Sequence, residues 1–324
     1  MLKIASFVLQ TGMVLSLACA FVVRARKQTL AQASQAVRPT VEAGLQAAAM
    51  HWIDDGWRWD WDMPVHKDES IHKEFSVPAV GGHRSIEVDN VFGSIEVSGA
   101  SGDGVRLDVD KTFHAQSNQA LERAEKDVAL DIEQESGRLK MAVQYPSGCA
   151  WGDCRSFDDH TYAVETSFQL QVPRDSDLTL RTVDGRDLRV RDVNGTFSIS
   201  NVNGGITMED IAGSGSVRTV NGPIRVTFRE NPRADSQFAS VNGGVDLYFA
   251  KNLSADFRFR TFSGNVYSDF PVLAAPVDMP EEQRHGTKYY FRTNAAGGGR
   301  VGAGGPLIRV ENLNGDIRIL EKHD

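Results

Sequence analysis

The sequence predicts an all-β protein, a right-handed parallel β-solenoid with one short helix inserted near its N-terminal part and an apolar helix at the start. Three observations predict this fold class. Glycine occurs 30 times in 324 residues, above its usual share of about 7%. Apolar and polar residues alternate in short runs, as in half-buried strands. Asn-Gly or Asp-Gly also recurs directly after an apolar residue, at nearly equal steps.

The chain begins with an uncharged, mostly apolar run from Ile4 to Val23. As a helix this run would be about 30 Å long, enough to cross a bilayer. Two interpretations stay open: a signal peptide cleaved near Ala18-Cys19-Ala20, or an uncleaved membrane anchor. A lipoprotein signal around residues 16–19 is a third, poorer fit. Residues 1–27 are therefore predicted to be a signal peptide or membrane anchor, and the protein to be exported to the cell envelope.

The cysteines bear on the compartment. Cys149 and Cys154 enclose four residues, a gap that a disulfide can close across a loop in an oxidising compartment. The sequence therefore predicts a Cys149–Cys154 disulfide. Free thiols are the first alternative, and a metal site is the second, for which His160 would supply only a third ligand.

Residues 28–75 are predicted to be a linker that contains a short helix and a tryptophan-rich segment, 52–61. Trp57, Trp59 and Trp61 alternate, so a strand would place all three on one face. Such a strip could bind a sugar or a membrane interface, or it could be buried against the neighbouring domain.

From residue 76 to residue 324 the pattern is that of β-strands. Apolar residues alternate with polar ones at 86–88, 95–97 and 105–109. One stretch, 118–128, instead has apolar residues at helical spacing. Strands resume at 130–132, 139–143 and 168–172, and Pro173 ends the last of these.

Beyond Pro173 a unit of alternating apolar residues followed by Asn-Gly or Asp-Gly repeats at steps of 9, 10 or 21 residues. Stacked coils would place Val183, Val202, Val220 and Val241 in an inward column. They would also align Asn203, Asn221 and Asn242 at a corner, where the amides could bond along the stack. An antiparallel meander or sandwich is the alternative, because Asn-Gly also forms two-residue hairpins. The long step from 264 to 315 contains a predicted insertion, 273–305. The predicted structural turn residues are Gly185, Gly195, Gly204, Gly222, Gly243, Gly264 and Gly315.

A continuous core is predicted from the fixed offset of apolar residues to the turn glycines. Its predicted members are Val202, Ile206, Met208, Val217, Val220, Ile224, Val226 and Val241.

Several of these segments together resemble a known family. They are the strand–helix–strand segment 105–145, the run Val172-Pro173-Arg174-Asp175, the serial Val-Asn-Gly units and the closing strands 308–319. In this order they resemble the bacterial β-strand-repeat family of adhesin-like β-solenoids of unknown function, over about residues 80–320. The resemblance implies an envelope-associated binding or scaffold protein with no established chemistry. The tryptophan-rich segment, the Cys149–Cys154 loop and the insertion depart from the family pattern.

The charge balance excludes a nucleic-acid-binding surface. Beyond residue 27 the chain has 31 basic and 43 acidic residues, a net charge of −12, whereas nucleic-acid binding needs a basic footprint. The glycine-rich run 297–305 lacks the Gly-Lys-Ser/Thr of a phosphate-binding loop, which favours a flexible insert. No cofactor is predicted.

Several carboxylates and one histidine in the turns could take part in catalysis or metal binding, or could simply be solvated. Asp192 and Asp210 occupy similar places in the repeat and could meet as an acid/base pair. Asp177, Asp184 and Asp192 could in principle hold calcium. His160 is an isolated loop histidine. We expect all of these side chains to be solvated and predict no catalytic, cofactor-binding or metal residues. The carboxylates weighed for catalysis are Asp184, Asp187, Asp192, Glu209, Asp210 and Asp246.

The sequence therefore predicts a non-catalytic, adhesin-like binding or scaffold module of the cell envelope. Its partner is expected to be a protein or a neutral glycan, with membrane attachment through the run from Ile4 to Val23 if that run is not cleaved. A carbohydrate-active β-solenoid enzyme, a polysaccharide lyase or hydrolase, is the alternative. The expected outward face is small, polar and mixed in charge: Ser198, Ser200, Thr207, Arg218, Thr219, Arg225 and Thr227.

Overall fold

Strands make up nearly all of the regular structure that the computed structural model describes, which covers residues 63–145, 161–184, 186–274, 282–285, 288–291 and 296–322. These residues belong to one unit, Met63–Asp324. The prediction of an all-β protein with one short helix agrees with this content. Within the described ranges no helix is long and apolar enough to cross a bilayer. The apolar run from Ile4 to Val23 lies outside those ranges.

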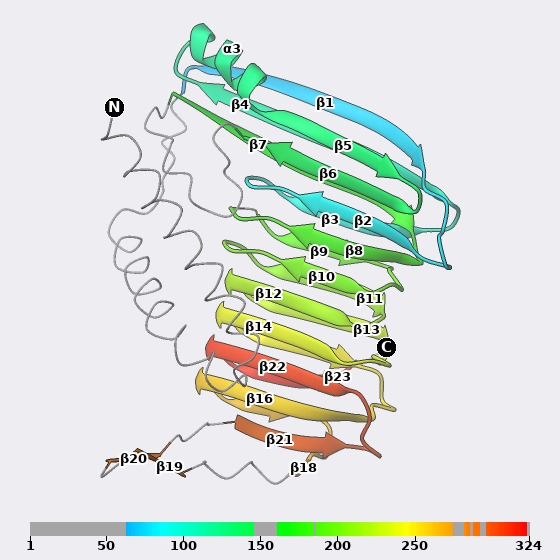
Figure 1. Ribbon diagram of the computed structural model, residues 1–324, viewed down its shortest axis with the longest axis vertical. Helices are drawn as coiled ribbons and strands as arrows, with labels where there is room; N and C mark the ends of the chain where they lie inside the picture. Colours follow the sequence, from blue (N-terminus) through cyan, green and yellow to red (C-terminus); the bar gives the residue numbers. More distant parts are fainter. Residues whose placement is uncertain are drawn as a thin grey trace, which may run out of the picture. The chain divides into compact units, whose positions relative to one another are not determined.

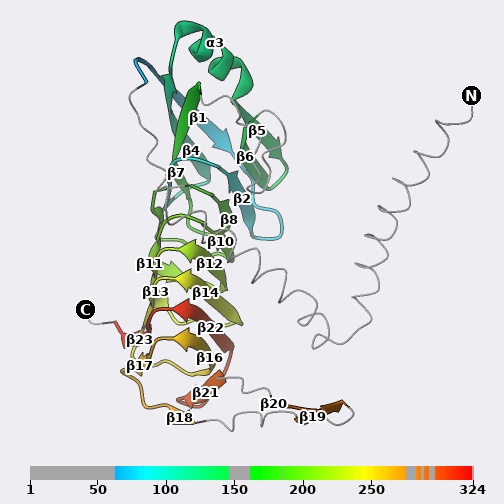
Figure 2. The ribbon, with the colours of Figure 1, turned by 90° about the vertical axis from the view of Figure 1, so that its left-hand side faces the viewer.

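Two large sheets form the body of the unit, and their strands lie face to face through the central part (Figures 1 and 2). The ten-stranded sheet has the order β1 (Val65–Ser76), β4 (Gly104–Ala115), β7 (Tyr162–Pro173), β3 (Ile95–Ala100), β9 (Leu188–Arg191), β11 (Ile206–Ala212), β13 (Ile224–Glu230), β15 (Val245–Phe249), β23 (Ile317–Glu321), β17 (Val266–Ser268). The eleven-stranded sheet has the order β18 (Leu273–Ala274), β21 (Ala296–Val301), β16 (Ala255–Ser263), β22 (Leu307–Asn314), β14 (Ser236–Asn242), β12 (Gly215–Asn221), β10 (Phe197–Ser200), β8 (Ser176–Arg181), β2 (Arg84–Asp89), β6 (Arg138–Gln144), β5 (Ala129–Glu135). A separate pair joins β19 (Glu282–His285) to β20 (Lys288–Phe291).

Three long strands in the N-terminal part of the unit pair antiparallel. β1, β4 and β7 are each 12 residues long, and β4 pairs antiparallel with both of its neighbours. The helix α3 (Asn118–Asp127) follows β4, and the Ser117 side chain caps it by accepting a hydrogen bond from the Ala120 amide at 3.2 Å. Ala120 and Ala124 are buried. The helix predicted at 118–128 is confirmed.

The central part of the unit is parallel. From β8 to β15 the chain alternates between the two sheets, and each strand pairs in parallel with the strand two steps away in sequence. The register places like residues side by side, as in the partners Ile206 and Ile224 or Val226 and Leu247. Equal repeat steps in the sequence therefore correspond to equal rungs in this part.

The predicted fold class, a right-handed parallel β-solenoid through residues 76–324, is wrong. Both sheets are mixed, because β1–β4–β7, β5–β6 and β16–β21–β18 pair antiparallel. The strand order also departs from the chain order, since β22 lies between β14 and β16, and β23 lies between β15 and β17. Apart from β16, which ends just before the turn at Gly264, the antiparallel strands lie outside the turn motifs on which the solenoid prediction rested. The last two strands, β22 and β23, can insert into the stack because backbone hydrogen bonds form between any two strands, whatever their order in the chain.

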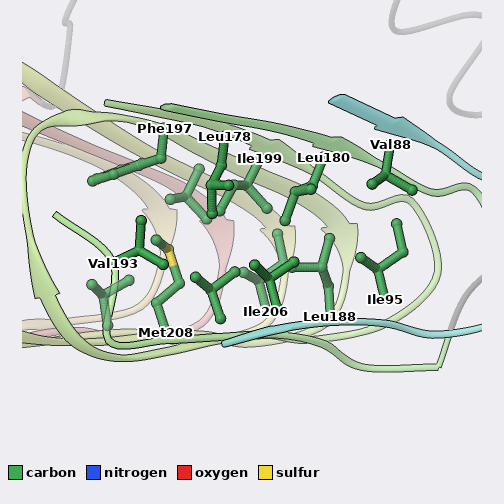
Figure 3. Packing of buried hydrophobic residues seen from close by; sticks show 14 of the residues in the cluster. Val88, Ile95, Leu178, Leu180, Leu188, Val193, Phe197, Ile199, Ile206 and Met208 are labelled. Carbon is green, nitrogen blue, oxygen red and sulfur yellow. The ribbon is translucent and has the colours of Figure 1, made fainter. Parts of the chain in front are cut away.

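The core lies between the two sheets. Leu178 and Ile199 of the eleven-stranded sheet point toward Ile206 and Leu188 of the ten-stranded sheet (Figure 3). These side chains are at most 2% exposed. Aromatic rings continue the core toward the C-terminal end, where Phe228 stacks on Phe249 with ring centroids 5.0 Å apart.

The predicted core is correct for five residues and wrong for three. Ile206, Met208, Val217, Ile224 and Val226 are buried, but Val202, Val220 and Val241 are only half-buried. The expected inward column of valines next to the turns therefore does not exist, because the inward position is held by the preceding polar residue. Thr219 and Ser240 are buried at these places. Side chains alternate along a strand, so the valine that follows must face outward.

The predicted insertion 273–305 contributes strand to the body of the unit. Its glycine-rich run contains β21, which pairs antiparallel with β16 from Ala296 opposite Arg260 to Val301 opposite Ala255. Gly297 and Gly299 are therefore in extended backbone within a sheet.

Candidate functional site

A ladder of asparagines runs along one corner of the stack, beside the eleven-stranded sheet. The Asn221 Nδ2 donates to Asn203 Oδ1, the Asn242 Nδ2 donates to Asn221 Oδ1, and the Asn314 Nδ2 donates to Asn242 Oδ1, each at 2.8 Å. The prediction that Asn203, Asn221 and Asn242 bond along the stack is confirmed, and the late strand β22 adds Asn314. Amide ladders of this kind stabilise stacked parallel strands because each amide both donates and accepts.

Asp184 is at the end of this ladder that lies next to β8. Burial raises the pKa of its carboxyl, and a hydrogen bond with the Asn203 side chain opposes that rise. The ladder therefore ends on a partly desolvated acid. Asp184 therefore has a structural role, because its carboxyl is hydrogen-bonded to the last asparagine of the ladder, Asn203.

A second, inward set of polar side chains satisfies the turn backbone. The Thr219 Oγ1 donates to the Gly204 carbonyl at 2.9 Å, and the Ser240 Oγ donates to the Gly222 carbonyl at 3.0 Å. Buried carbonyl groups without a partner would be costly. The buried Thr and Ser side chains therefore complete the turns from inside, as does the amide of Asn312, whose Nδ2 donates to the Gly243 carbonyl at 2.9 Å.

The predicted turn glycines differ in what they require. Gly195 has no positive φ, but a Cβ there would overlap the Ser176 backbone carbonyl, so close approach requires glycine. Gly185 lies outside the described residues. The other five have φ between +137° and +158°, a region that favours glycine. They are Gly204, Gly222, Gly243, Gly264 and Gly315.

Asp192 and Asp210, the carboxylates considered for acid/base chemistry, lie at the opposite corner. Both have left-handed backbone, with φ of 58° and 53°. The Arg229 guanidinium links them, because its NH1 donates to the Asp192 Oδ1 at 2.9 Å and to the Asp210 carbonyl at 3.3 Å. Asp210 also forms an ion pair with Lys322 at 2.9 Å. Each carboxylate thus has its own cation, and the two do not form a carboxylate pair.

The other acids singled out from the sequence are also engaged. Glu209 pairs with Arg191 at 2.8 Å, and Asp246 lies between Arg225 and Arg318, 3.6 Å from each. Asp187 accepts hydrogen from the Gly205 amide at 3.2 Å. Asp177 accepts from the Thr196 amide at 2.7 Å, a turn contact far from the arrangement a calcium site needs. Among the residues that the structure describes, no group of three or more His, Cys, Asp or Glu side chains could hold a metal ion.

Most of the predicted polar face does point outward. Thr219 is the exception, since it is buried and bonded to a turn. The remaining members are exposed or half-buried on the outer faces: Ser198, Ser200, Thr207, Arg218, Arg225 and Thr227.

A trough of about 490 Å³ lies on the outer face of the ten-stranded sheet. It crosses four adjacent strands, β4, β7, β3 and β9, at the place where antiparallel pairing gives way to parallel pairing. Eight of its ten lining residues are polar or charged, and the other two, Val97 and Leu170, are apolar. The lining residues are Glu96, Val97, Ser98, Arg106, Asp108, Gln169, Leu170, Gln171, Arg189 and Arg191.

The charges around the trough are balanced in pairs. Arg189 pairs with Glu96 at 2.9 Å, and Arg106 donates to Glu74 at 3.2 Å and to Gln171 at 3.2 Å. Arg191 is held by Glu209 outside the trough. The trough therefore offers fixed hydrogen-bond donors and acceptors with little excess charge of either sign.

The sequence did not single out these trough residues. Gln169, Gln171 and Arg106 alternate with buried residues on β7 and β4, so their outward direction could be read from the sequence. That they share a surface with Arg189 could not be read from the sequence, because β9 follows β7 in this sheet only across β3, a strand from much earlier in the chain.

Some predicted features lie outside the described residues. They are Cys149, Cys154 and His160, and the tryptophan-rich segment 52–61. The disulfide, its thiol and metal alternatives and the aromatic strip all stay predictions.

Comparison with known proteins gives only distant structural likenesses. No family model matches the chain, and no curated protein matches it. A putative cell adhesion protein from Clostridium sporogenes is 13% identical, with a TM-score of 0.38, over 79% of this chain and 100% of that one. A putative adhesin from Bacteroides fragilis is 10% identical, with a TM-score of 0.31, over 78% and 97%. A putative lipid binding protein from Parabacteroides distasonis is 10% identical, with a TM-score of 0.23, over 77% and 96%. The first two names agree with the resemblance read from the sequence. Identities of this order leave ligand and activity to be argued from this chain's own residues.

Proposed function

We propose that the protein is an exported, non-catalytic, adhesin-like binding module of the cell envelope. The trough on the outer face of the ten-stranded sheet is its binding site, and a neutral glycan is the ligand class that the trough fits. The observation that carries this proposal is the set of paired charges and amides that line the trough.

The chemistry of the lining supports a neutral, polar ligand. A volume of about 490 Å³ is within the range of ordinary ligand sites, about 300–1,000 Å³. Gln169 and Gln171 each present an amide that can donate and accept, as sugar hydroxyls can. Because Arg189 and Glu96 neutralise each other, neither a strongly anionic nor a strongly cationic ligand is favoured. A protein partner is the alternative occupant.

The binding is expected to be weak at each site. None of the trough's lining residues is aromatic, so stacking on sugar rings cannot contribute there. Hydrogen bonds that replace bonds to water contribute only about 0.5–1.5 kcal/mol each. Tethering of several copies at the cell surface would raise the overall affinity through multivalency, which suits an adhesin-like role at the envelope.

Binding of neutral glycans by the full-length protein tests this proposal. The chain, purified in mild detergent with its N-terminal segment, is applied to an array of neutral oligosaccharides. Arg189→Ala and Gln169→Ala should each weaken binding about fivefold, as expected for one lost hydrogen bond of about 1 kcal/mol. Arg218→Ala is the matched control, because Arg218 is exposed on the outer face of the other sheet and donates to Gln237 at 2.8 Å.

Other outcomes would contradict the proposal. Neutral glycans that bind wild type and both trough variants equally would remove the trough as the site. Protein partners lost from the same variants would favour a protein ligand. Release of reducing ends that depends on Asp192 or Asp210 would favour the carbohydrate-active enzyme.

A further inference from the structure

Two histidines face each other across β1 and β4 on the outer face of the ten-stranded sheet. His66 and His114 are register partners in this antiparallel pair. Their Nδ1 atoms are 2.8 Å apart, and the rings meet edge to face with centroids 4.9 Å apart. At this distance one Nδ1 must donate a hydrogen and the other must accept it. The pair thus holds two imidazole nitrogens on one small patch of surface.

The groups around the pair are mainly acidic. Asp68 lies two residues from His66 on the same side of β1, and Glu165 lies two residues beyond Ala163, the β7 partner of His114. Burial is the main cause that lowers the pKa of His114; His66 lowers it further, and Glu165 and Asp68 act in the opposite direction. Glu165 is also 3.6 Å from Arg186.

The nearest lysine does not oppose a cation at this place. Lys67 is the register partner of buried Phe113, so its side chain leaves the other face of β1, where it pairs with Glu125 of α3 at 2.5 Å. The face that carries the two histidines therefore combines two nitrogen donors with nearby negative charge.

We propose that His66 and His114 bind a divalent transition-metal ion through their Nδ1 atoms, with Cu²⁺ preferred over Zn²⁺. Bonds of about 2.0 Å would put the two nitrogens about 2.8 Å apart in a square-planar ion and about 3.3 Å apart in a tetrahedral one. The distance of 2.8 Å is closer to the square-planar value, which Cu²⁺ adopts. Imidazole sites also bind Cu²⁺ more tightly than Zn²⁺ in general.

The site is open rather than closed. The described residues contain no group of three or more potential ligands, so the two imidazoles are the protein's nitrogen donors. The carboxylates of Asp68 and Glu165 add attraction, and water completes the coordination. When the ion binds, the hydrogen between the Nδ1 atoms leaves and that ring carries its proton on Nε2 instead. With both rings neutral beforehand, no net proton is released.

Copper binding to the full-length protein tests the site. Isothermal titration with Cu²⁺ at pH 7.5 should show one site that binds more tightly than any other, and the electron paramagnetic resonance spectrum should show two equivalent nitrogens. His66→Ala and His114→Ala should each weaken binding at least tenfold. The double variant should bind Cu²⁺ no more weakly than either single variant, because each single substitution already removes the two-histidine chelate. At pH 5.5, where imidazoles are protonated, the wild-type affinity should fall at least tenfold.

A matched control separates this pair from single surface histidines. His72 is exposed on the same strand, with its Nδ1 2.6 Å from the Asp108 carboxylate, and His72→Ala should bind Cu²⁺ like the wild type. If His114→Ala unfolds by circular dichroism, His114→Gln and His66→Ala carry the test, since His66 is exposed. Equal losses in His72→Ala and His66→Ala, additive losses in the double variant, or a single-nitrogen spectrum would each overturn the proposal.

Discussion

Two parts of the molecule hold neighbouring strands in register in different ways. They are the antiparallel part, β1–β4–β7 with α3, and the parallel part, β8 to β15. In the parallel part, neighbouring rungs are alike, and the turns at Asn221 and Asn242 are each held by an outer asparagine and an inner Thr or Ser. In the antiparallel part, long strands set the register by their own length and alternation. The repeated turns of the parallel part therefore provide regular polar contacts between rungs, whereas the long strands of the antiparallel part provide continuous backbone pairing.

The two parts also differ in what they bury. The parallel part buries neutral polar side chains that donate to turn carbonyls, and it also buries the Asp246 carboxylate, 3.6 Å from both Arg225 and Arg318. The antiparallel part buries Lys111, whose Nζ donates only a long 3.4 Å contact to the Val128 carbonyl at the end of α3. The buried carboxylate of the parallel part therefore has two guanidinium groups beside it, whereas the buried lysine under α3 donates to a backbone carbonyl.

The largest expected effect tests whether the two parts unfold together. Phe238→Ala in the parallel part and Phe113→Ala under α3 remove rings that are 0% and 1% exposed. Each should lower the free energy of unfolding by about 3–5 kcal/mol. Denaturant unfolding should keep one transition in both variants, since one core cluster joins the parts. A second transition in either variant would show that the parts unfold separately.

Gly243→Ala should break the regular turn of the parallel part. The φ of Gly243 is +151°, and an added Cβ would overlap the Gly222 carbonyl of the neighbouring rung. We expect a loss of about 2–4 kcal/mol from backbone strain and displacement, measured by urea unfolding. Gly297→Ala is the control, since nothing lies within 4 Å of the added Cβ. Equal stability of the two variants would show that the close approach of Gly243 to the Gly222 carbonyl does not require glycine.

Lys111→Met should stabilise the antiparallel part by about 1–2 kcal/mol at pH 7, because a buried, unpaired charge is costly. Burial lowers the pKa of Lys111 from its usual value of 10.5. The cost is complete below the folded-state pKa and disappears as the pH rises toward 10.5. The advantage of the methionine variant should therefore shrink with rising pH in thermal unfolding. A constant advantage would mean that packing, and not charge, is responsible.

Asn221→Ala should separate the interior of the ladder from its end. It removes two amide hydrogen bonds, whereas Asn314→Ala removes one of those described here. The interior change should cost about 1 kcal/mol and the end change about half of that, by denaturant unfolding. A ladder with no stabilising role would give equal, negligible losses.

Asp184→Asn should give the smallest effect, a gain of about 0.5 kcal/mol at pH 7. Burial raises the folded-state pKa of Asp184 above 3.8, so the ionised carboxylate costs stability above that pKa, and the cost vanishes as the pH falls below 3.8. The gain should therefore disappear in acid. A gain that persists at pH 3 would point to better packing of the amide.

The Asn ladder and the one helix could be predicted from local pattern. The spacing of Asn221 and Asn242 from their neighbours predicted the ladder in the parallel part, and helical spacing predicted α3 in the antiparallel part. The trough could not be predicted, since Arg106 and Arg189 meet only through the order of strands between them. The pairing of His66 with His114 depends likewise on a register that joins residues 48 positions apart.

The sequence by itself determined that the chain forms strands with alternating side chains and where most of its turns fall, because these follow from local backbone preferences and side-chain period. The tertiary structure alone decided which strands are neighbours, that β22 and β23 insert into the stack, and that Thr219 faces inward while Val220 faces outward. The physical reason is that strand hydrogen bonds are alike for every residue. The choice of partner is therefore made by packing across the whole core and by the few polar groups that must find a partner at each corner.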